Sequence, residues 1–312
     1  MSITVVGSVA FDAVKTPFGE RQRMLGGAAT YFALAASFFD HVHVVGRVGA
    51  DFGERELAVL ASRGTDIEDV ERVADGKTFF WAGEYGWDLN SRDTLDTQLN
   101  VFADFEPRLS ASSRACDALF LANIQPELQA GVLDQCEDAK FVAMDSMNFW
   151  IDGARDALLE VIRRVDCVIL NDAELRQLTE RPSLVRAARE VLELGPSVVV
   201  AKQGEYGAAL LTDDQFFALP AYPLETVVDP TGAGDTFAGG FMGYLSRHLD
   251  RPLTDAVLRR AMAYGTALAS FSVEEFGTER VERLTAGEVD ARVEELRRIT
   301  EFEHVPVPLQ AS

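Results

Sequence analysis

Asp235 follows a glycine-rich turn, and a carboxylate placed among glycines is an arrangement that could do chemistry. Gly232 and Gly234 lack a Cβ, so the backbone can bend sharply there and approach a ligand closely. The apolar residues that follow predict a helix to about Leu249, whose first N–H groups and positive dipole end would attract a phosphate. Because a carboxylate repels an anion, we expect Asp235 to take a proton from a hydroxyl that attacks the phosphate. The alternative is that Asp235 only caps the helix.

The same stretch carries a family resemblance. Residues 229–235 read Asp-Pro-Thr-Gly-Ala-Gly-Asp, and they resemble the D-T-x-G-A-G-D signature of the pfkB/ribokinase family of carbohydrate and nucleoside kinases, with Pro230 at the usual threonine. The resemblance implies an enzyme that transfers the γ-phosphoryl group of ATP to an alcohol group with the help of Mg²⁺. The residues that it assigns to the reaction are the base Asp235 and the anion hole formed by Gly232, Ala233 and Gly234.

The resemblance also implies ligands beside this turn. It places Thr231, Gly232 and Gly234 against the nucleotide, and by analogy with relatives it allows a K⁺ ion near Asp229 and Thr231. Family members place the adenine near the Ala-rich helix predicted over residues 255–271.

Composition and charge exclude several classes of protein. The chain has 312 residues with 47% hydrophobic content, which suits a globular protein, and no apolar run reaches the roughly 20 residues that span a membrane. The net charge of −21 argues against a nucleic-acid partner; it leaves open whether the acidic balance reflects a high-salt cytoplasm. The N-terminus enters a strand pattern directly, which predicts a cytoplasmic protein. His41 and His43 alternate on a predicted strand and indicate structural roles.

Short apolar runs alternate with helical patterns in the middle of the chain. The runs lie at 118–123, 140–145, 165–170 and 197–202. This alternation predicts a parallel sheet covered on both faces. With the resemblance, we expect an α/β protein with a ribokinase-like three-layer fold: a mainly parallel sheet, helices on both faces and a small β lid. The single kinase domain would span 1–312, with lid segments near 13–25 and 77–104.

Polar residues end the predicted strands, where ligands of such sheets bind. Asn123 and Asp145 are candidates for contacts with the acceptor, although polar residues at strand ends are equally often only solvated. Lys202 could reach a phosphate as a point charge, and Gly204 lies in the following turn, which resembles the nucleotide side of the family. The alternative for Lys202 is an exposed position in solvent.

Asn171 and Glu174 resemble the N-x-x-E element that holds the Mg²⁺ shell and phosphates in this family. One amide and one carboxylate suffice for Mg²⁺, because the ion keeps several of its waters. Asn171 is thereby also a nucleotide contact. The alternative is a capping box, in which the two residues only stabilise the start of a helix.

The N-terminal part supplies the candidate acceptor site. Residues 3–11 predict the first strand, and Asp12 resembles the aspartate that grips acceptor hydroxyls in the family; a carboxylate accepts two such bonds. Gly26 and Gly27 match the family pattern G-G-x-x-x-N-x-A, but Tyr31 stands where asparagine is usual. This departure leaves the acceptor open.

The segment 77–104 mixes aromatic and polar residues, which suggests a lid over a pocket, or a face through which a homodimer forms. A small sugar is the first choice of acceptor by family frequency. A nucleoside is the alternative, because Phe79, Trp81 and Tyr31 could stack on a base. A non-catalytic sugar-sensing relative is a third hypothesis, which Asp235 disfavours because a sensor needs no base.

Overall fold

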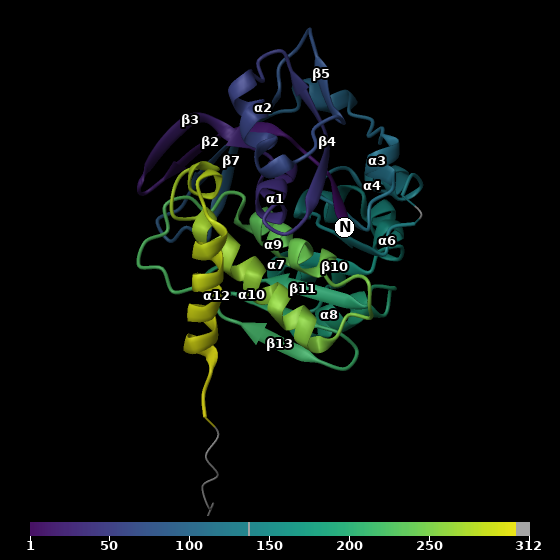
Figure 1. Cartoon of the computed structure of the whole chain (residues 1–312), viewed down its shortest axis with the longest axis vertical. Helices are drawn as coiled ribbons and strands as arrows, with labels where there is room; N and C mark the ends of the chain where they lie inside the picture. The colour runs from purple at the N-terminus through teal and green to yellow at the C-terminus, as the bar shows by residue number, and fades with distance from the viewer. Residues whose placement is uncertain (137, 304–312) are drawn as a thin grey trace, which may run out of the picture.

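A nine-stranded sheet and a separate four-stranded sheet form the framework of the computed structural model, which describes residues 1–136 and 138–303 (Figure 1). The large sheet has the order β13-β12-β11-β10-β9-β8-β1-β4-β5, parallel from β11 to β5, with β12 and β13 antiparallel at one edge. Its strands are β1 (Ser2–Val6), β4 (His41–Gly49), β5 (Val70–Val73), β8 (Ala118–Leu121), β9 (Phe141–Met144), β10 (Cys167–Asn171), β11 (Val198–Lys202), β12 (Ala208–Leu211) and β13 (Phe216–Leu219).

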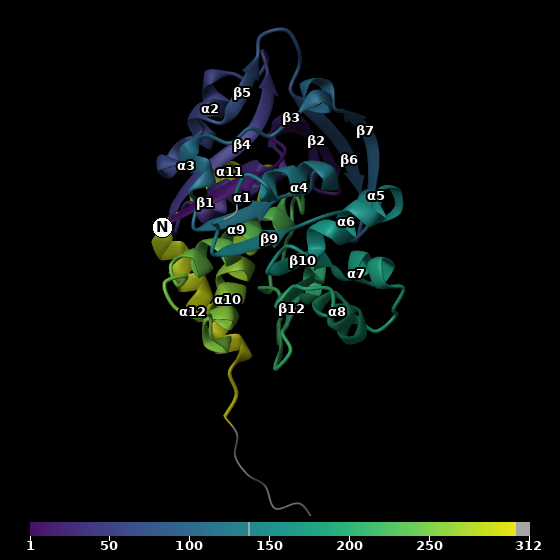
Figure 2. The same ribbon diagram turned by 90° about the vertical axis from the view of Figure 1, so that its right-hand side faces the viewer.

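Helices cover both faces of the large sheet, because the side chains of its central strands are apolar on both faces. Val5 belongs to one buried cluster and Val6 to the other, as strand alternation requires. The first cluster packs on α1 (Ala28–Ala36), α9 (Ala233–Ser246) and α10 (Asp255–Ser272). The second packs on α4 (Pro126–Leu133), α6 (Arg155–Ile162), α7 (Asp172–Thr179) and α8 (Leu184–Leu192). This is the three-layer α/β arrangement that the sequence predicts (Figure 2).

Shorter helices and one long helix complete the described chain. They are α2 (Glu54–Leu60), α3 (Ala111–Arg114), α5 (Asn148–Gly153), α11 (Glu279–Glu282) and α12 (Ala286–Thr300). Within the described ranges, every helix is too short or too polar to cross a membrane.

The small sheet is built from two separate parts of the chain, residues 10–26 and 79–98, where the sequence predicts lid segments near 13–25 and 77–104. Its order is β3-β2-β6-β7, and its strands are β2 (Ala10–Thr16), β3 (Gly19–Gly26), β6 (Phe79–Tyr85) and β7 (Arg92–Gln98). The prediction of one strand over residues 3–11 is therefore wrong. The chain leaves the large sheet after Val6, and β2 pairs with β3 and β6 instead.

Glycines let α9 lie very close to its neighbours. A Cβ at Gly239 would lie 2.3 Å from the Phe32 carbonyl oxygen, and one at Gly240 would lie 3.0 Å from the Tyr264 carbonyl oxygen. Both distances are below normal van der Waals contact, so only glycine permits this packing. The close contact fixes the start of α9, where Asp235 lies, between α1 and α10.

Candidate functional site

The start of α9 forms the centre of the candidate site. Gly232 is the residue before the helix and has φ of +73°, a conformation that side chains with a Cβ rarely adopt. Asp235 lies in the first turn of α9, and the helix has no side-chain cap hydrogen bond. The helix-capping alternative for Asp235 is therefore wrong. Asp235 lies in the first turn, whose N–H groups have no partner within the helix.

The preceding turn is held by Asp229, which is fully buried. Its Oδ1 accepts a hydrogen bond from the Thr231 amide at 2.9 Å, and its Oδ2 accepts one from the Gly277 amide at 3.0 Å. The Thr231 hydroxyl donates to the Tyr85 hydroxyl at 3.2 Å. Asp229 thus braces the glycine turn from both sides.

Tyr31 covers this turn from α1. A Cβ at Gly232 would lie 2.4 Å from the Tyr31 ring, so the ring packs directly on the glycine. The ring is 2% exposed, and its hydroxyl has no hydrogen-bond partner in the described structure. Burial, and then the carboxylates of Asp12 and Asp229, raises the pKa of Tyr31 well above its usual value. The hydroxyl is therefore a neutral, unused donor inside the site.

Asp12 lies in β2, within the small sheet, and faces the same region. A Cβ at Gly26 would lie 2.0 Å from the Asp12 Oδ2 atom, so only glycine fits beside this carboxylate. Gly27 has φ of +95°, and a hydrogen bond from its amide lowers the pKa of Asp12, against the larger effects that raise it. Burial, followed by the charges of Asp229 and Asp235, raises the pKa of Asp12 to about 7. Asp12 and Asp235 are thus two carboxyls in one buried region.

Lys202, at the end of β11, supplies positive charge beside the glycines. Its Nζ lies 2.6 Å from Asp145 Oδ2 and would be 3.0 Å from a Cβ at Gly234. Burial lowers its pKa, but the carboxylates of Asp145, Glu174 and Asp235 outweigh that effect and the net pKa is raised. The side chain is 18% exposed, so the alternative of a solvent-exposed lysine is wrong. Asp145, a predicted acceptor contact, is the ion-pair partner of this lysine.

Asn171 and Glu174 form a capping box at the start of α7. The Glu174 amide donates to Asn171 Oδ1 at 2.7 Å, and the Asn171 amide donates to Glu174 Oε2 at 2.8 Å. Burial, and then the charge of Asp145, raises the pKa of Glu174 to about 7, while Lys202 opposes the shift. The capping box, which was the alternative from the sequence, is therefore present in the structure. A nearby cation would stabilise the charged form of the Glu174 carboxyl group.

Asn123, the other predicted acceptor contact, has a partner outside this centre. Its Oδ1 accepts a hydrogen bond from the Trp150 indole N–H at 3.1 Å, on α5. The structure thus places Asp12, Tyr31, Lys202, Glu174 and the α9 glycines together, while the side chain of Asn123 is bound to α5.

Tyr85 and Arg92, both in the small sheet, belong to the site although sequence reasoning does not identify them. Asp12 pairs with Trp81 across β2 and β6, and Tyr85 pairs with Arg92 across β6 and β7. Trp81 and Tyr85 are an even number of residues apart in β6, so they share one face of the sheet. The Arg92 guanidinium lies 5.2 Å from the centre of the Trp81 ring, and its charge is among the influences that lower the pKa values of Asp12, Glu174 and Asp235. A single arginine in a polar segment carries no signal in the sequence, because its partners are distant along the chain.

A cavity of about 510 Å³ opens from Lys202 and Gly234 toward α10. Gly204 lies on its wall, as do Asn90 from the β6–β7 turn and Ala269 from α10. The Asn90 side chain donates to Glu205 at 3.0 Å, which ties the turn of the small sheet to this wall. The cavity lies where the family resemblance places the nucleotide.

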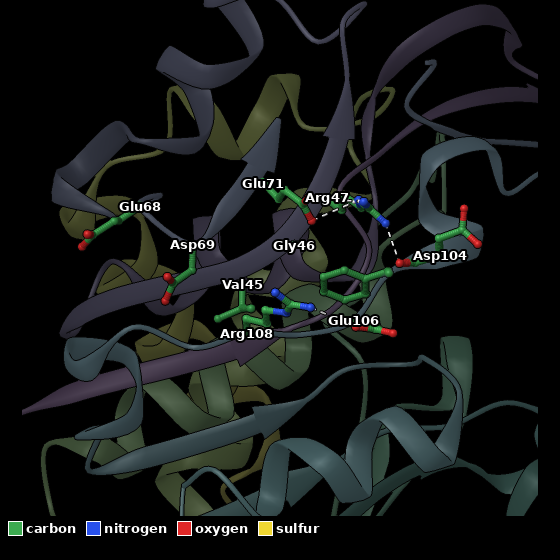
Figure 3. A pocket seen from close by; sticks show the side chains of 10 residues that line it. Val45, Gly46, Arg47, Glu68, Asp69, Glu71, Asp104, Glu106 and Arg108 are labelled. Atoms are coloured by element: carbon green, nitrogen blue, oxygen red, sulfur yellow. Dashed lines mark hydrogen bonds and ion pairs between the residues drawn. The ribbon is translucent and has the colours of Figure 1, made fainter. Parts of the chain in front are cut away.

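A second hollow, of about 390 Å³, lies beside β4 and β5 (Figure 3). Its charged lining residues are Arg47, Glu68, Asp69, Glu71, Asp104, Glu106 and Arg108. The Arg47 Nε lies 3.0 Å from Glu71, and its Nη1 donates to the Asp104 carbonyl. Because carboxylates outnumber guanidinium groups, this hollow repels phosphates and is no candidate for nucleotide binding.

Comparisons with known proteins show the family to which this chain is similar. The family model described as pfkB family carbohydrate kinase matches residues 2–283. The cytidine kinase of Thermococcus kodakarensis is 32% identical over 266 residues, which cover 82% of this chain and 92% of that protein. The nucleoside kinase of Methanothermobacter thermautotrophicus is 28% identical over 323 residues, which cover 91% and 96%.

The fold has close structural neighbours. The solved structure of the Methanocaldococcus jannaschii nucleoside kinase, a member of the ribokinase family, has a TM-score of 0.76 to this chain at 22% identity, with 94% of this chain and 98% of that chain covered. At this identity the likeness bears on the fold alone, which is ribokinase-like.

The raised pKa values predict how stability depends on pH. Burial, and then the charge of Asp145, raises the pKa of Asp235 from 3.8 to about 7. The folded protein then holds a proton that the unfolded chain has lost, so this group makes stability fall as pH rises from about 4 to 7. We expect Asp235→Asn, without ligands, to be more stable than the parent at pH 8 by about 1 kcal/mol or more.

Urea unfolding at pH 5 and pH 8 measures this difference. The advantage of Asp235→Asn should grow between the two pH values. Asp255→Asn is the matched control, because Asp255 also lies in the first turn of a helix but is exposed. An equal pH dependence in Asp235→Asn and the parent would contradict the raised pKa.

Proposed function

Because the chain belongs to the pfkB family of carbohydrate kinases, we propose that it is a nucleoside kinase, which transfers the γ-phosphoryl group of ATP to a nucleoside hydroxyl. The sequence alone puts a sugar first and a nucleoside second. The cytidine kinase and the nucleoside kinase, each matched over most of both chains, support the second acceptor better.

The observation that carries the proposal is that the Trp81 ring lies beside Asp12, the carboxylate that would bind the acceptor. Trp81 is the paired neighbour of Asp12 on the inner face of the small sheet, and its ring is half-buried. An aromatic face can stack on a nucleobase, while Asp12 accepts hydrogen bonds from two ribose hydroxyls. A small sugar would fill the carboxylate site and leave the ring unused. Phe79, the third predicted stacking residue, instead stacks on Phe102 with ring centres 5.5 Å apart.

Tyr31 adds a second contact on the acceptor side. Its ring lies on Gly232 and its hydroxyl has no partner within the described chain. A buried donor without a partner is unfavourable by about 1 to 3 kcal/mol, so an acceptor oxygen or a phosphate oxygen that accepts its hydrogen bond gains that amount. Tyr31, which stands where the family usually has asparagine, would therefore contribute to binding.

The nucleotide would occupy the 510 Å³ cavity, with adenine toward α10 and the phosphates toward α9. Lys202 lies where the phosphates would lie, and Asp145 keeps it there by a 2.6 Å ion pair. The Gly234 backbone can approach the phosphate because no Cβ intervenes. Positive charge and amide donors thus converge on the γ-phosphate.

The reaction follows from the position of Asp235 between these two parts of the site. Its carboxylate takes the proton of the attacking hydroxyl, the hydroxyl oxygen forms a bond to the γ-phosphorus, and the bond from that phosphorus to the β–γ bridging oxygen breaks to release ADP. A pKa of about 7 suits a general base at neutral pH. The amides at the start of α9 and Lys202 stabilise the charge that develops on the phosphoryl oxygens.

Mg²⁺ fits the site on electrostatic grounds. Asp145, Glu174 and Asp235 raise the pKa of Lys202 together, which shows that carboxylates crowd around one lysine. Glu174 and Asn171 would hold the ion through its waters, and the ion would neutralise charge on the phosphates. For K⁺ near Asp229 and Thr231, the support is analogy alone, since both oxygens of Asp229 accept backbone hydrogen bonds; comparing rates at low and high KCl tests it.

The first test is the acceptor. A panel of sugars and nucleosides with ATP and Mg²⁺, followed by ADP release, should give its highest kcat/KM with a nucleoside. Trp81→Ala should raise the KM for the nucleoside by roughly 5- to 160-fold, since base stacking contributes about 1 to 3 kcal/mol, and should leave the KM for ATP unchanged. Trp87→Ala is the control, because Trp87 is 88% exposed in the neighbouring turn.

Three outcomes of the panel and of the variant kinetics would contradict this assignment. A sugar preferred over every nucleoside restores the first choice made from the sequence. If no compound of the panel is phosphorylated at low or at high KCl, the sugar-sensing alternative is favoured. Equal effects of Trp81→Ala on both substrates would mean that Trp81 does not contact the acceptor.

The second test is the base. Asp235→Asn keeps the size of the side chain but cannot accept the proton, so kcat should fall by about 10²- to 10⁴-fold. ATP affinity should hold or tighten, because a negative charge near the γ-phosphate is removed. Asp255→Asn, in the first turn of α10, should keep the parental kcat. A kcat for Asp235→Asn within a few-fold of the parent, with chemistry rate-limiting, would sink the mechanism.

The third test separates metal binding from helix capping at Glu174. Glu174→Gln keeps an oxygen for the Asn171 amide but loses the charge, so activity should fall and recover in part at higher Mg²⁺. Glu288→Gln makes the same change in the capping box of α12 and should leave the Mg²⁺ dependence unchanged. Equal losses of thermal stability in the two variants, with normal Mg²⁺ dependence in both, would assign Glu174 to capping alone.

A further inference from the structure

We propose that His41, His43 and Asp66 form a zinc site at the end of the large sheet where its parallel strands begin, opposite the end that carries the kinase site. The three residues each offer one ligand atom, and these atoms all lie within 4.8 Å of one another. His41 begins β4 and pairs with Ser2 of β1, so the cluster lies where these parallel strands begin, near the N-terminus marked in Figure 2. The kinase residues lie where the strands end.

The backbone of β4 and of the segment before β5 fixes the cluster. His41 and His43 are two residues apart in a strand, so both imidazoles lie on one face, with ring centres 4.7 Å apart. Asp66 is bridged to His43 in parallel register, and its amide and carbonyl bond to β4 at 2.7 and 2.9 Å. The carboxylate therefore points to the same face as the two rings.

The distances suit a tetrahedral ion. Zinc bonds of about 2.0 to 2.2 Å to nitrogen and oxygen place neighbouring ligand atoms roughly 3.3 Å apart. His43 Nδ1 and Asp66 Oδ2 are 3.2 Å apart. His41 is exposed and can turn its ring toward this pair, whereas His43 is 6% exposed and held in place. The Glu68 amide donates to the other oxygen of Asp66 at 2.9 Å and orients the carboxylate, as outer partners of metal ligands do.

The chemistry of the donors selects the ion. Two imidazoles and one carboxylate are typical of zinc, whereas Mg²⁺ and Ca²⁺ prefer oxygen ligands alone. Three protein ligands leave a fourth position for water. The net charge of −21 attracts cations to the surface in general, so the test must separate this cluster from binding elsewhere. An ion here would join β4 to the segment that leads to the edge strand β5 and would resist separation of the two.

The experiment is a Zn²⁺ titration of the chelator-treated full-length protein without nucleotide, with affinity from competition against a chromophoric chelator. We expect one tight Zn²⁺ per chain and a rise in Tm when it binds. His41→Ala should weaken this binding by more than the roughly 10- to 100-fold that the loss of an outer partner produces. Asp66→Asn should weaken it as well, and His248→Ala, which changes a histidine on another part of the surface, should not.

Two results would overturn the proposal: no tight Zn²⁺ in the parent, or the same affinity in His41→Ala and the parent. His41 is exposed, so its variant should fold, and its circular dichroism spectrum and Tm without zinc check this. Co²⁺ provides an independent readout, since its visible absorption in the parent should show a tetrahedral site with nitrogen ligands and be lost in His41→Ala. Kinase activity in excess Mg²⁺ should be the same in His41→Ala and the parent, which keeps this test separate from that of the proposed function.

Discussion

The concentration of buried negative charge around one helix start is the constraint on which the rest of the site depends. Burial, and then the charges of Asp229 and Asp235, raises the pKa of Asp12 to about 7. Burial, and then the charge of Asp145, raises the pKa values of Asp235 and Glu174 to about 7. Lys202 and Arg92 are the cations that oppose these shifts. An arrangement of this kind is unfavourable for the empty protein, and it becomes favourable when cations and hydroxyl donors enter.

The two sheets divide the task of building this site. The large sheet carries Lys202 and Asn171 at its carboxyl ends, and α9 brings the glycines and Asp235 to the same place. The small sheet brings Asp12, Trp81 and Arg92 from the other side. Thr231 and Tyr85 join the two parts by a hydrogen bond between their hydroxyls. Movement of the small sheet would therefore take Asp12 and Trp81 away from α9 and remove the Arg92 charge from Asp235 at the same time.

Local pattern was a reliable guide wherever one element decides the geometry. The α9 glycines and the capping residues Asn171 and Glu174 each lie at the start of one helix, the βαβ alternation repeats along consecutive elements, and each of these was found from sequence. The first strand was misplaced because residues 3–11 form an apolar run that only Gly7 and Ser8 interrupt, and nothing local says that the chain changes sheets after Val6. Asp145 and Asn123 were correctly placed at strand ends, but their partners Lys202 and Trp150 depend on packing.

By itself the sequence determined the family, the α/β class and the helix that starts at the glycine turn with Asp235 in its first turn, because these depend on residue types at short, fixed spacings. Only the tertiary structure decided that Tyr31 lies on Gly232, that Arg92 reaches the carboxylates, and that Asp66 joins His41 and His43. The physical reason is that each of these contacts joins segments far apart in the chain. Their separation is set by how sheets and helices pack, and no local spacing records it.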